Sequence, residues 1–405
     1  MKQTTTGNAG PKVRSDIEVT LMITEAGGIN LEIKSRVKSM YGIAIEKQCR
    51  ELLDLFEVKN AKLTVNDSGA LPFVIAARVE AAVKALTDTK TSFLPEMIGE
   101  NIYSSSRERF RFSRLYLPGN NPGMFLNAGL HSPDGIILDL EDSVAPDRKD
   151  EARILVRNAL RAVNFYGAER MVRINQGERG LEDLEYVIPN NVHLVLIPKC
   201  ENAATVRQVD DRIMQIKKRL GQDETVFLMP IIESAGGVER AFEIATASPS
   251  VVALAIGLED YTADLGVQRT KEGSESLYAR NRIVVAAKAA GIQPIDSVFS
   301  DVADMEGLLD NVRSSKAMGF EGMGCIHPRQ IAVIRHGFSP SDDETERAKK
   351  IVVAYRDALE KGLGVVALGS KMIDPPVVAR AEKTITLAVR LGLLPEDWAE
   401  AEAKQ

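Results

Sequence analysis

From residue 112 onward, short apolar runs alternate eight times with longer amphipathic stretches, and this pattern restricts the fold more than any other feature of the chain. The strands that it predicts span residues 114–118, 135–140, 171–175, 193–198, 226–232, 251–256, 293–299 and 322–326. Eight strands that alternate with helices are typical of an α/β chain folded as a parallel (β/α)8 TIM barrel. An open doubly wound sheet is the alternative, but the first strand is not followed by a glycine-rich turn of the dinucleotide-binding type.

Each predicted strand ends in a cluster of polar residues. In chain order, the clusters are Gly119-Asn120-Asn121, Glu141-Asp142, Asn175-Gln176 just after Arg173, Lys199, Glu233, Glu259-Asp260, Ser300-Asp301 and His327. Active sites of such barrels form at the C-terminal ends of the strands. These side chains are therefore expected to line one shared pocket.

Two of the clusters indicate a site for a hard metal ion. Glu233 and Asp260 are 27 positions apart (260 − 233 = 27). That spacing suits a strand, a helix and the next strand, which brings both carboxylates to one edge of the sheet. Mg²⁺ needs few protein ligands, because it keeps several waters and takes other oxygens from the substrate. The alternative is that both acids are solvated loop ends.

The chain is long enough for more than a barrel. It has 405 residues, of which 44% are hydrophobic, and the barrel accounts for only about 220 residues. We predict three regions: a small α+β domain over residues 1–92, the barrel over residues 93–338, and a C-terminal helical lid or oligomerisation segment over residues 339–405.

The two flanking regions have patterns of their own. Before the barrel, the sequence predicts strands at 17–23, 29–33 and 61–66, helices at 43–56 and 71–86, and a polar linker at 87–92. After the barrel, residues 342–363 and 377–391 have the pattern of amphipathic helices with more apolar surface than a lid alone needs.

Composition and charge argue against several classes of partner. The net charge of −6 and the pI near 5.6 offer no basic surface for nucleic acid or an anionic membrane. No apolar stretch approaches the roughly 20 residues that span a bilayer, and the N-terminus lacks a signal-peptide core, so a cytoplasmic protein is expected. Cys49, Cys200 and Cys325 form neither a metal-spaced cluster nor an even disulfide set, which favours reduced, buried thiols.

Several stretches of the chain resemble known families. The N-terminal region resembles the acyl carrier subunit of citrate lyase, and the remainder resembles the citrate lyase beta subunit and related citramalyl- and malyl-thioester lyases of the HpcH/HpaI aldolase superfamily. The supporting stretches include Tyr41-Gly42-Ile43-Ala44-Ile45, Asp67-Ser68-Gly69-Ala70-Leu71, Leu138-Asp139-Leu140-Glu141-Asp142, Val172-Arg173-Ile174-Asn175, Gly257-Leu258-Glu259-Asp260, Ile326-His327-Pro328 and Met372-Ile373-Asp374.

The resemblance implies a magnesium-dependent lyase. Such enzymes cleave a 3-hydroxy-3-carboxyacyl thioester into an acetyl-type thioester and a 2-oxo acid, and Glu233 and Asp260 match their Mg²⁺ ligands. Arg173 matches the arginine that holds the carboxylate of the oxo acid, a role that suits the planar fork of a guanidinium. The other substrate-binding candidates are Gly119, Asn120 and Lys199, at the ends of the first and fourth strands.

Three further acids have expected roles. Glu141 and Asp142 would bond metal-bound waters or basic side chains from a second layer. Asp374 matches the aspartate that gives a proton to the enolate, on a tail that covers a neighbouring subunit's pocket, which implies a homo-oligomer such as a trimer. The alternative for Asp374 is a helix N-cap before Pro375. His327 is expected to be a structural hydrogen-bonding residue.

The carrier-like region departs from its family at the attachment point of the prosthetic group. There the coenzyme-A-derived phosphopantetheine arm hangs on a serine two residues before the aspartate that aligns with Asp16, but the equivalent residue here is Arg14, and Ser15 is the nearest serine. Either the attachment has moved to Ser15 or the region is a retained structural domain. The first barrel strand also departs, because it has Arg111-Phe112 where relatives commonly have paired arginines.

Three hypotheses follow. The chain is a lyase that cleaves a citryl-type thioester to an acetyl thioester and oxaloacetate, with or without other citrate-lyase-like subunits. Alternatively, it is a citramalyl-CoA or malyl-CoA lyase that uses free coenzyme A thioesters. In a different class, it is a non-catalytic assembly subunit, which the intact set of Arg173, Glu233, Asp260 and Asp374 disfavours.

Overall fold

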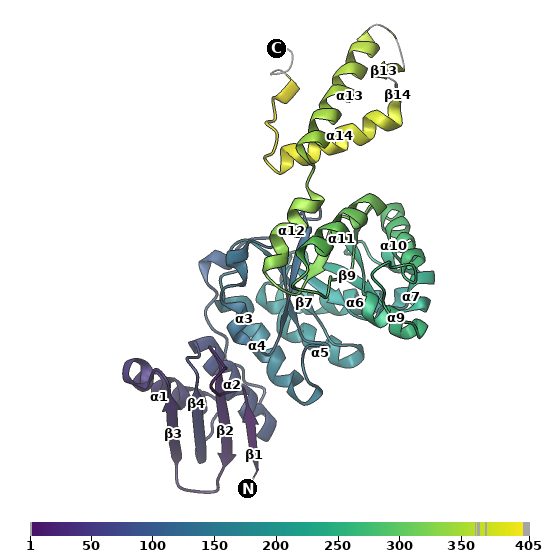
Figure 1. Cartoon of the computed structure of the whole chain (residues 1–405). Helices are drawn as coiled ribbons and strands as arrows, with labels where there is room; N and C mark the ends of the chain where they lie inside the picture. Colours follow the sequence, from purple (N-terminus) through teal and green to yellow (C-terminus); the bar gives the residue numbers. More distant parts are fainter. Residues whose placement is uncertain (1, 361, 363–364, 369–370, 400–405) are drawn as a thin grey trace. The chain divides into compact units, whose positions relative to one another are not determined.

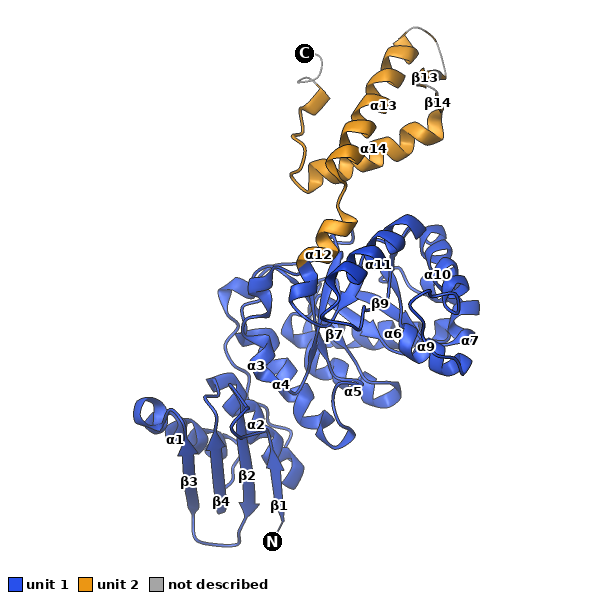
Figure 2. Ribbon diagram, viewed as in Figure 1, with its two compact units in different colours: residues 1–331 blue, residues 332–405 orange. Residues whose placement is uncertain are grey.

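The computed structural model describes residues 2–360, 362, 365–368 and 371–399. The chain divides into two compact units, residues 1–331 and residues 332–405 (Figure 2). The first unit contains the barrel and the N-terminal region, and the second contains the helices of the tail (Figure 1).

Eight parallel strands form the centre of the first unit, which confirms the predicted barrel. In the order in which they pair, they are β11 (Gln293–Ile295), β10 (Ala253–Ile256), β9 (Phe227–Ile232), β8 (Leu194–Ile197), β7 (Glu169–Arg173), β6 (Gly135–Asp139), β5 (Ser113–Pro118) and β12 (Met323–Cys325). A single parallel bridge from Asp296 to Met323 joins the two ends. The expected strand 293–299 is shorter in the structure: β11 ends at Ile295, Asp296 forms only the isolated bridge, and its carboxylate accepts hydrogen bonds from Arg280 and Ser315.

Helices surround this ring of strands (Figure 1). They are α3 (Pro122–Phe125), α4 (Lys149–Ala162), α5 (Gly177–Val187), α6 (Ala203–Leu220), α7 (Ala235–Glu239), α8 (Ala241–Ala245), α9 (Leu258–Leu265), α10 (Leu277–Ala289), α11 (Met305–Met318) and α12 (Arg329–Phe338), the last of which crosses the boundary between the units. Because the helices cover the outer face, strands such as β9 are buried along their whole length.

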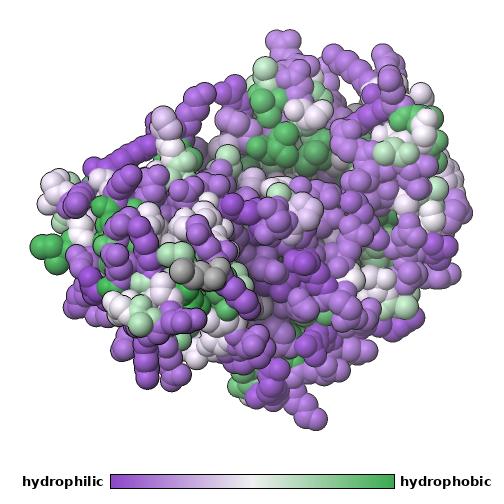
Figure 3. Space-filling model, turned by 90° about the horizontal axis from the view of Figure 1, so that it is seen from below, coloured by the Kyte–Doolittle hydropathy of each residue, from purple (hydrophilic) through white to green (hydrophobic). Residues whose placement is uncertain are grey.

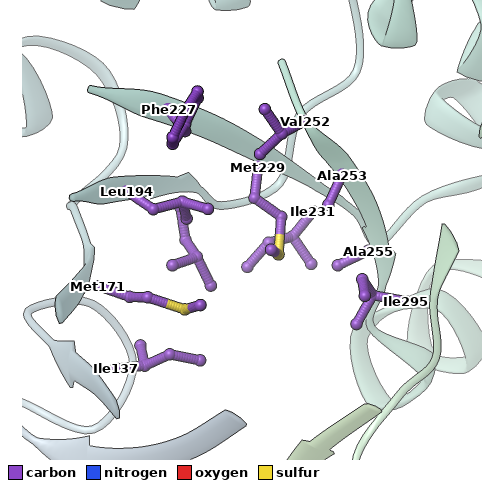
Figure 4. Packing of buried hydrophobic residues seen from close by; sticks show 11 residues of the cluster. Ile137, Met171, Leu194, Phe227, Met229, Ile231, Val252, Ala253, Ala255 and Ile295 are labelled. Atoms are coloured by element: carbon purple, nitrogen blue, oxygen red, sulfur yellow. The ribbon is translucent and has the colours of Figure 1, made fainter. Parts of the chain in front are cut away.

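Apolar side chains fill the inside of the barrel (Figure 4). Met171, Leu194, Met229 and Ile231 point toward one another from neighbouring strands, together with Ile137, Leu196, Phe227, Val252, Ala253, Ala255 and Ile295. Burying one such large side chain contributes about 1.5–3 kcal/mol. This core therefore fixes the strand ends that carry the polar clusters. The three cysteines are free and buried, and burial raises the pKa of each thiol to about 12.

The N-terminal region is a four-stranded mixed sheet with two helices. Its strands β1 (Gln3–Thr6), β2 (Ile17–Ile23), β4 (Ala61–Asp67) and β3 (Ile29–Ser35) lie in that order, and its helices are α1 (Lys38–Leu55) and α2 (Pro72–Leu86). The β3–β4 pair is parallel and the other two pairs are antiparallel. Strand β1 is an edge strand that the sequence analysis missed, because its Gln-Thr-Thr-Thr sequence is polar throughout.

A buried arginine joins this region to the barrel. Arg78 of α2 is fully buried and donates two hydrogen bonds of 3.0 Å to the Asp16 carboxylate. It also donates to the Asn120 backbone oxygen, at 2.9 Å, in the loop after β5, and its Nη1 lies 3.2 Å from a Glu151 oxygen on α4. One guanidinium therefore connects two acids and a loop from both parts of the unit.

A second buried ion pair lies between helices α2 and α4. Arg157 donates to both carboxylate oxygens of Glu80, at 2.8 and 2.7 Å, and both side chains are almost completely buried. Nearby, Asn158 donates to the Phe73 backbone oxygen. Removing one partner of such a pair leaves an uncompensated buried charge. These contacts therefore hold the N-terminal region on the barrel.

The second unit is a helical pair with a short hairpin. Helix α13 (Asp342–Glu360) packs against α14 (Pro375–Arg390), and strands β13 (Val366–Leu368) and β14 (Lys371–Ile373) lie between them in the chain. Their shared core includes Ile351, Val352, Ile373, Val378, Ile385 and Trp398. The end of the expected helix 342–363 lies outside the described residues. Asp374 caps α14, because its Oδ1 accepts a hydrogen bond of 3.2 Å from the Val377 amide.

None of the described helices combines the length and the apolar character that a membrane span requires. On the face of the molecule shown in Figure 3, hydrophilic side chains predominate and hydrophobic ones form small, separate groups.

Candidate active site

A cavity of about 570 Å³ lies at the C-terminal ends of the barrel strands. Residues from the strands and from the loops that follow them line it, among them Arg114, Tyr116, Pro118, Met124, Asn127, His131, Asp139, Ser143, Arg173, Glu233, Gly257, Asp260, Ser297, Gly324 and His327. Three of the predicted site residues, Arg173, Glu233 and Asp260, thus line a single cavity.

The Glu233 carboxylate is fixed by its surroundings. Glu233 follows β9, is 7% exposed, and accepts a hydrogen bond of 2.9 Å from the Lys199 amide. Burial raises its pKa to about 7, and the negative charges of Asp260 and Glu141 act in the same direction. Gly257 leaves room for this side chain, because a Cβ there would lie 2.5 Å from Glu233 Oε1.

The neighbouring acids Glu259 and Asp260 point to different partners. Both lie in the first turn of α9. Glu259 pairs with Arg269, at 2.7 Å, whereas Asp260 Oδ1 lies 3.6 Å from the Lys199 ammonium. Asp260 is therefore the member of this pair that faces the other polar groups of the site.

Lys199 lies among three carboxylates. Its Nζ is 3.4 Å from Glu141, 3.3 Å from Asp142 and 3.6 Å from Asp260. Burial would lower its pKa, but these acids raise it. Its backbone has φ of +44°, which is uncommon for a residue other than glycine. Strain of this kind is typical of functional sites.

Arg173, at the end of β7, is held by acids. Its Nε and Nη2 donate to both oxygens of Asp139, at 2.6 and 2.8 Å, and its Nη1 lies 3.2 Å from Glu141. Burial alone would raise the Asp139 pKa, but the hydrogen bonds and charge of Arg173 lower it. The guanidinium also lies over the Tyr116 ring, 5.5 Å from its centre. Asp139 thus binds Nε and Nη2, and Nη1 is directed to other partners.

Glu141 joins the basic groups to one another. Its carboxylate contacts Arg173 and Lys199 and accepts a hydrogen bond of 2.9 Å from Gln176. Burial raises the Glu141 pKa, and its hydrogen bond with Asp142 adds to the effect. Neither Glu141 nor Lys199 lies among the residues that line the cavity, but each contacts one that does.

The donor set suits a hard divalent cation. Among the described residues, no group of three or more His, Cys, Asp or Glu side chains is arranged to hold a metal ion. Two carboxylates, Glu233 and Asp260, nevertheless line the cavity, and a lysine ammonium occupies the space beside the acids. Mg²⁺ fits such an open site, because it normally binds one or two carboxylates together with water and substrate oxygens.

The loop after β5 lies between the cavity and the N-terminal region. The Gly119 amide donates to the Asp139 backbone oxygen, at 2.7 Å, and a Cβ at Gly119 would lie 2.5 Å from that oxygen. At Gly123, a Cβ would lie 2.8 Å from the Arg14 backbone oxygen, while the next residue, Met124, lines the cavity. The turn that contains Ser15, which has φ of +58°, is therefore packed against a wall of the cavity.

His327 behaves as expected, whereas Asp374 lies apart from the other predicted site residues. His327 lines the cavity, and its Nδ1 accepts a hydrogen bond from the Arg329 amide. Asp374 belongs to the second unit. The sequence analysis missed Arg114, which lines the cavity from the second residue of β5. The available signal was a charged residue inside an otherwise apolar strand.

Comparison with known proteins identifies the barrel. A family model described as HpcH/HpaI aldolase/citrate lyase matches residues 113–328. The chain belongs to this family. Its N-terminal region matches, over residues 4–86, a model described as malonate decarboxylase delta subunit. The acyl-carrier-like character of that region and the lyase character of the barrel are thereby confirmed.

Two relatives and one solved structure show how this HpcH/HpaI member compares. It is 40% identical to the citrate lyase subunit beta of Haemophilus influenzae over 69% of its own length and 97% of the relative. It is 33% identical to the human mitochondrial citramalyl-CoA lyase over 80% and 99%. Its structure resembles Mycobacterium tuberculosis CitE in complex with magnesium, acetoacetate and coenzyme A, with a TM-score of 0.60 and 31% identity over 70% and 99% of the chains.

Proposed function

We propose that this HpcH/HpaI protein is a Mg²⁺-dependent lyase that cleaves a citryl-type thioester to an acetyl thioester and oxaloacetate. The observation that carries the proposal is that Glu233 and Asp260 line one cavity with Arg173. The citrate lyase beta subunits, at up to 40% identity, support the substrate class, as does an M. tuberculosis relative described in complex with oxaloacetate and magnesium.

The reaction moves negative charge between two places. The bond between the carbinol carbon and the carbon beside the thioester breaks, and its electron pair remains on the thioester fragment as an enolate. The hydroxyl loses its proton and becomes the carbonyl of the 2-oxo acid, and the enolate takes a proton. When bound by Glu233 and Asp260, Mg²⁺ supplies Lewis-acid stabilisation of the oxygen.

The chain's own residues position the oxo-acid fragment. Arg173 Nη1 is assigned to the substrate carboxylate, because Asp139 already holds the other side of the guanidinium. Lys199 adds positive charge beside Asp260, and Glu141 orients both Arg173 and Lys199. Gly119 and Asn120 hold the loop after β5 in place between the cavity and the N-terminal region. In that region, Ser15 is the proposed attachment point of a phosphopantetheine-type arm.

A lyase that uses free coenzyme A thioesters is the second candidate. The arginine at position 14 favours it, because the carrier family has its attachment serine there. The similarity to the human citramalyl-CoA lyase also favours it. Purification from the source organism, followed by intact-mass analysis and turnover assays, separates the two. We expect an added arm on Ser15 and release of oxaloacetate from a citryl thioester. An unmodified chain that cleaves free citramalyl-CoA would contradict this assignment, and absence of any cleavage would favour an assembly subunit.

Asp374 is proposed to protonate the enolate in the pocket of a neighbouring subunit of a homo-oligomer such as a trimer. Asp374→Asn is expected to lower turnover at least about 100-fold while leaving Mg²⁺ and oxo-acid binding nearly unchanged, because it removes a proton donor and no ground-state ligand. Asparagine also retains the N-cap of α14, so the fold should persist.

Mixing experiments test the composite site. Subunits with Asp374→Asn, mixed with Glu233→Gln subunits, should recover part of the turnover, since some pockets combine an intact acid with an intact metal site. Each variant mixed with itself is the control. Lack of recovery after verified subunit exchange would show that Asp374 does not serve a neighbouring barrel.

A further inference from the structure

Arg114 is a buried cation without an acid partner. It is 1% exposed, and its only hydrogen-bond partner among the described residues is the Met229 sulfur, 3.0 Å from Nη1. Its Nε has no partner at all, and no described carboxylate forms an ion pair with it. Glu169, an acid that acts electrostatically on Arg114, is already bound by two nitrogens of Arg111, at 2.7 and 2.8 Å.

An arrangement of this kind is costly for a folded protein. A guanidinium stays protonated at any physiological pH, and an isolated buried charge destabilises the fold unless a counter-charge is supplied. Burial accordingly lowers the Arg114 pKa. The missing counter-charge therefore has to come from outside the described chain.

The position of Arg114 indicates where that counter-charge enters. Arg114 and Tyr116 project into the barrel from β5, since Arg114 reaches Met229 and Tyr116 packs on the interior core. Both residues line the cavity that also contains Glu233, Asp260 and Arg173. Pro118 marks the C-terminal end of β5, so Arg114, four residues earlier, lies at the floor of this cavity and the metal-ligand candidates lie at its mouth.

The other cations of the site are already neutralised. Arg173 binds Asp139 and Glu141, and Lys199 lies beside three acids. Arg114 thus differs from both in having no carboxylate partner among the described residues. Tyr116 links the two levels of the cavity, because it lies two residues after Arg114 on β5 and its ring centre is 5.5 Å from the Arg173 guanidinium.

We propose that Arg114 binds the second, distal carboxylate of the oxo acid, so that the site selects dicarboxylic 2-oxo acids over monocarboxylic ones. This inference rests on the proposed lyase function and names the feature that separates a citryl-type from a citramalyl-type substrate. Oxaloacetate carries the additional carboxylate, whereas pyruvate would leave Arg114 unpaired. A site built to pair a substrate group rejects the analogue that lacks it, because its own buried group is then left without a partner.

The test compares oxaloacetate and pyruvate as ligands of the full-length protein in saturating Mg²⁺. Arg114→Met keeps the length and apolar volume of the side chain and removes its charge. We expect oxaloacetate affinity to fall on the order of 100-fold, as for the loss of one partner of a buried charge pair. Pyruvate affinity should stay within about twofold. Arg114→Lys retains the charge but not the planar guanidinium. Its preference for oxaloacetate over pyruvate should stay within about tenfold of the wild-type preference.

Thermal unfolding without ligand or metal separates a binding role from a structural one. Removal of an uncompensated charge should raise the Tm of Arg114→Met, and oxaloacetate should then stabilise the variant no more than pyruvate does. Equal weakening of both acids together with a lower Tm would overturn the proposal, as would an unchanged preference for oxaloacetate.

The outcome is separable from the test of the lyase itself. Suppose that the wild-type protein binds pyruvate at least as tightly as oxaloacetate but cleaves a citramalyl thioester with Mg²⁺. The role proposed for Arg114 is then wrong, and the lyase function stands. If Glu233→Gln cleaves thioesters as fast as the wild type, the proposed active site is wrong irrespective of Arg114.

Discussion

Glu233→Gln is expected to abolish Mg²⁺-dependent turnover and, at the same time, to make the metal-free protein more stable. The first effect follows because Glu233 is one of only two carboxylates proposed to hold the cation. The second follows from the pKa of about 7, against a usual value of 4.5. The raised pKa means that the fold loses stability as pH rises from about 4.5 to about 7, because the unfolded state ionises first; the loss is about 3 kcal/mol and is complete at pH 8. The gain in the variant should be largest there and vanish near pH 4.5.

Asp260→Asn is the matched control for this prediction. Its side chain is 43% exposed, so losing its charge should lower Mg²⁺ affinity and turnover without a comparable gain in stability. Urea unfolding from pH 4.5 to pH 8 in chelator, and Mg²⁺ titration monitored by thermal shift, provide both readouts. Full activity of either variant at ordinary Mg²⁺ concentrations would contradict the metal-site assignment. A Glu233→Gln protein that is less stable than the wild type at pH 8 would contradict the pKa argument.

Arg78→Met is expected to destabilise the first unit by about 3–5 kcal/mol, because Asp16 would remain buried without a cation and Glu151 would keep only Arg148. The loop after β5 would also lose the donor that holds the Asn120 backbone oxygen. Equilibrium unfolding in urea measures the change in free energy. The loss of packing alone is limited, since methionine retains most of the aliphatic length.

An exposed ion pair in the same region provides the comparison. Lys62 and Glu32 lie 2.9 Å apart with side chains 41% and 53% exposed, and Lys62→Met should cost less than about 1 kcal/mol. A double variant that combines Arg78→Met with Asp16→Asn should recover part of the lost free energy of unfolding. The asparagine removes the buried Asp16 charge that Arg78→Met leaves without a cation. Similar costs for Arg78→Met and Lys62→Met would show that burial of the Arg78 network contributes nothing.

The sequence predicted the barrel well because its signal is the simplest one available. Strands such as 226–232 are uninterrupted apolar runs between polar strand ends, and both faces of the corresponding β9 are buried. Glu233 and Asp260 were predicted to share a pocket for the same reason, since acids close after an apolar run stand out, and both line the cavity. The topology of parallel strands then brings such residues to one end of the barrel.

Contacts between distant segments left no comparable signal. The Asp139 partner of Arg173 looked like part of a strand, and no local pattern shows that its carboxylate binds a guanidinium 34 positions away. Strand β1 is polar and gains its place only by pairing with β2. Arg114 is a charged residue within an apolar strand, and such a local conflict is the signal that the sequence offered for it.

The ion pairs that hold helix α2 on helix α4 also bear on the kinetics of a carrier. A carrier on a separate chain must diffuse to its enzyme, so the rate depends on the concentrations of both. Here the turn at residues 14–15 is anchored on the loop that leads to Met124. If Ser15 bears an arm, its thioester explores one small, constant volume, and its effective concentration is set by the length of the arm alone. Delivery of the acyl group would then be independent of dilution, with one acyl group assigned to each barrel.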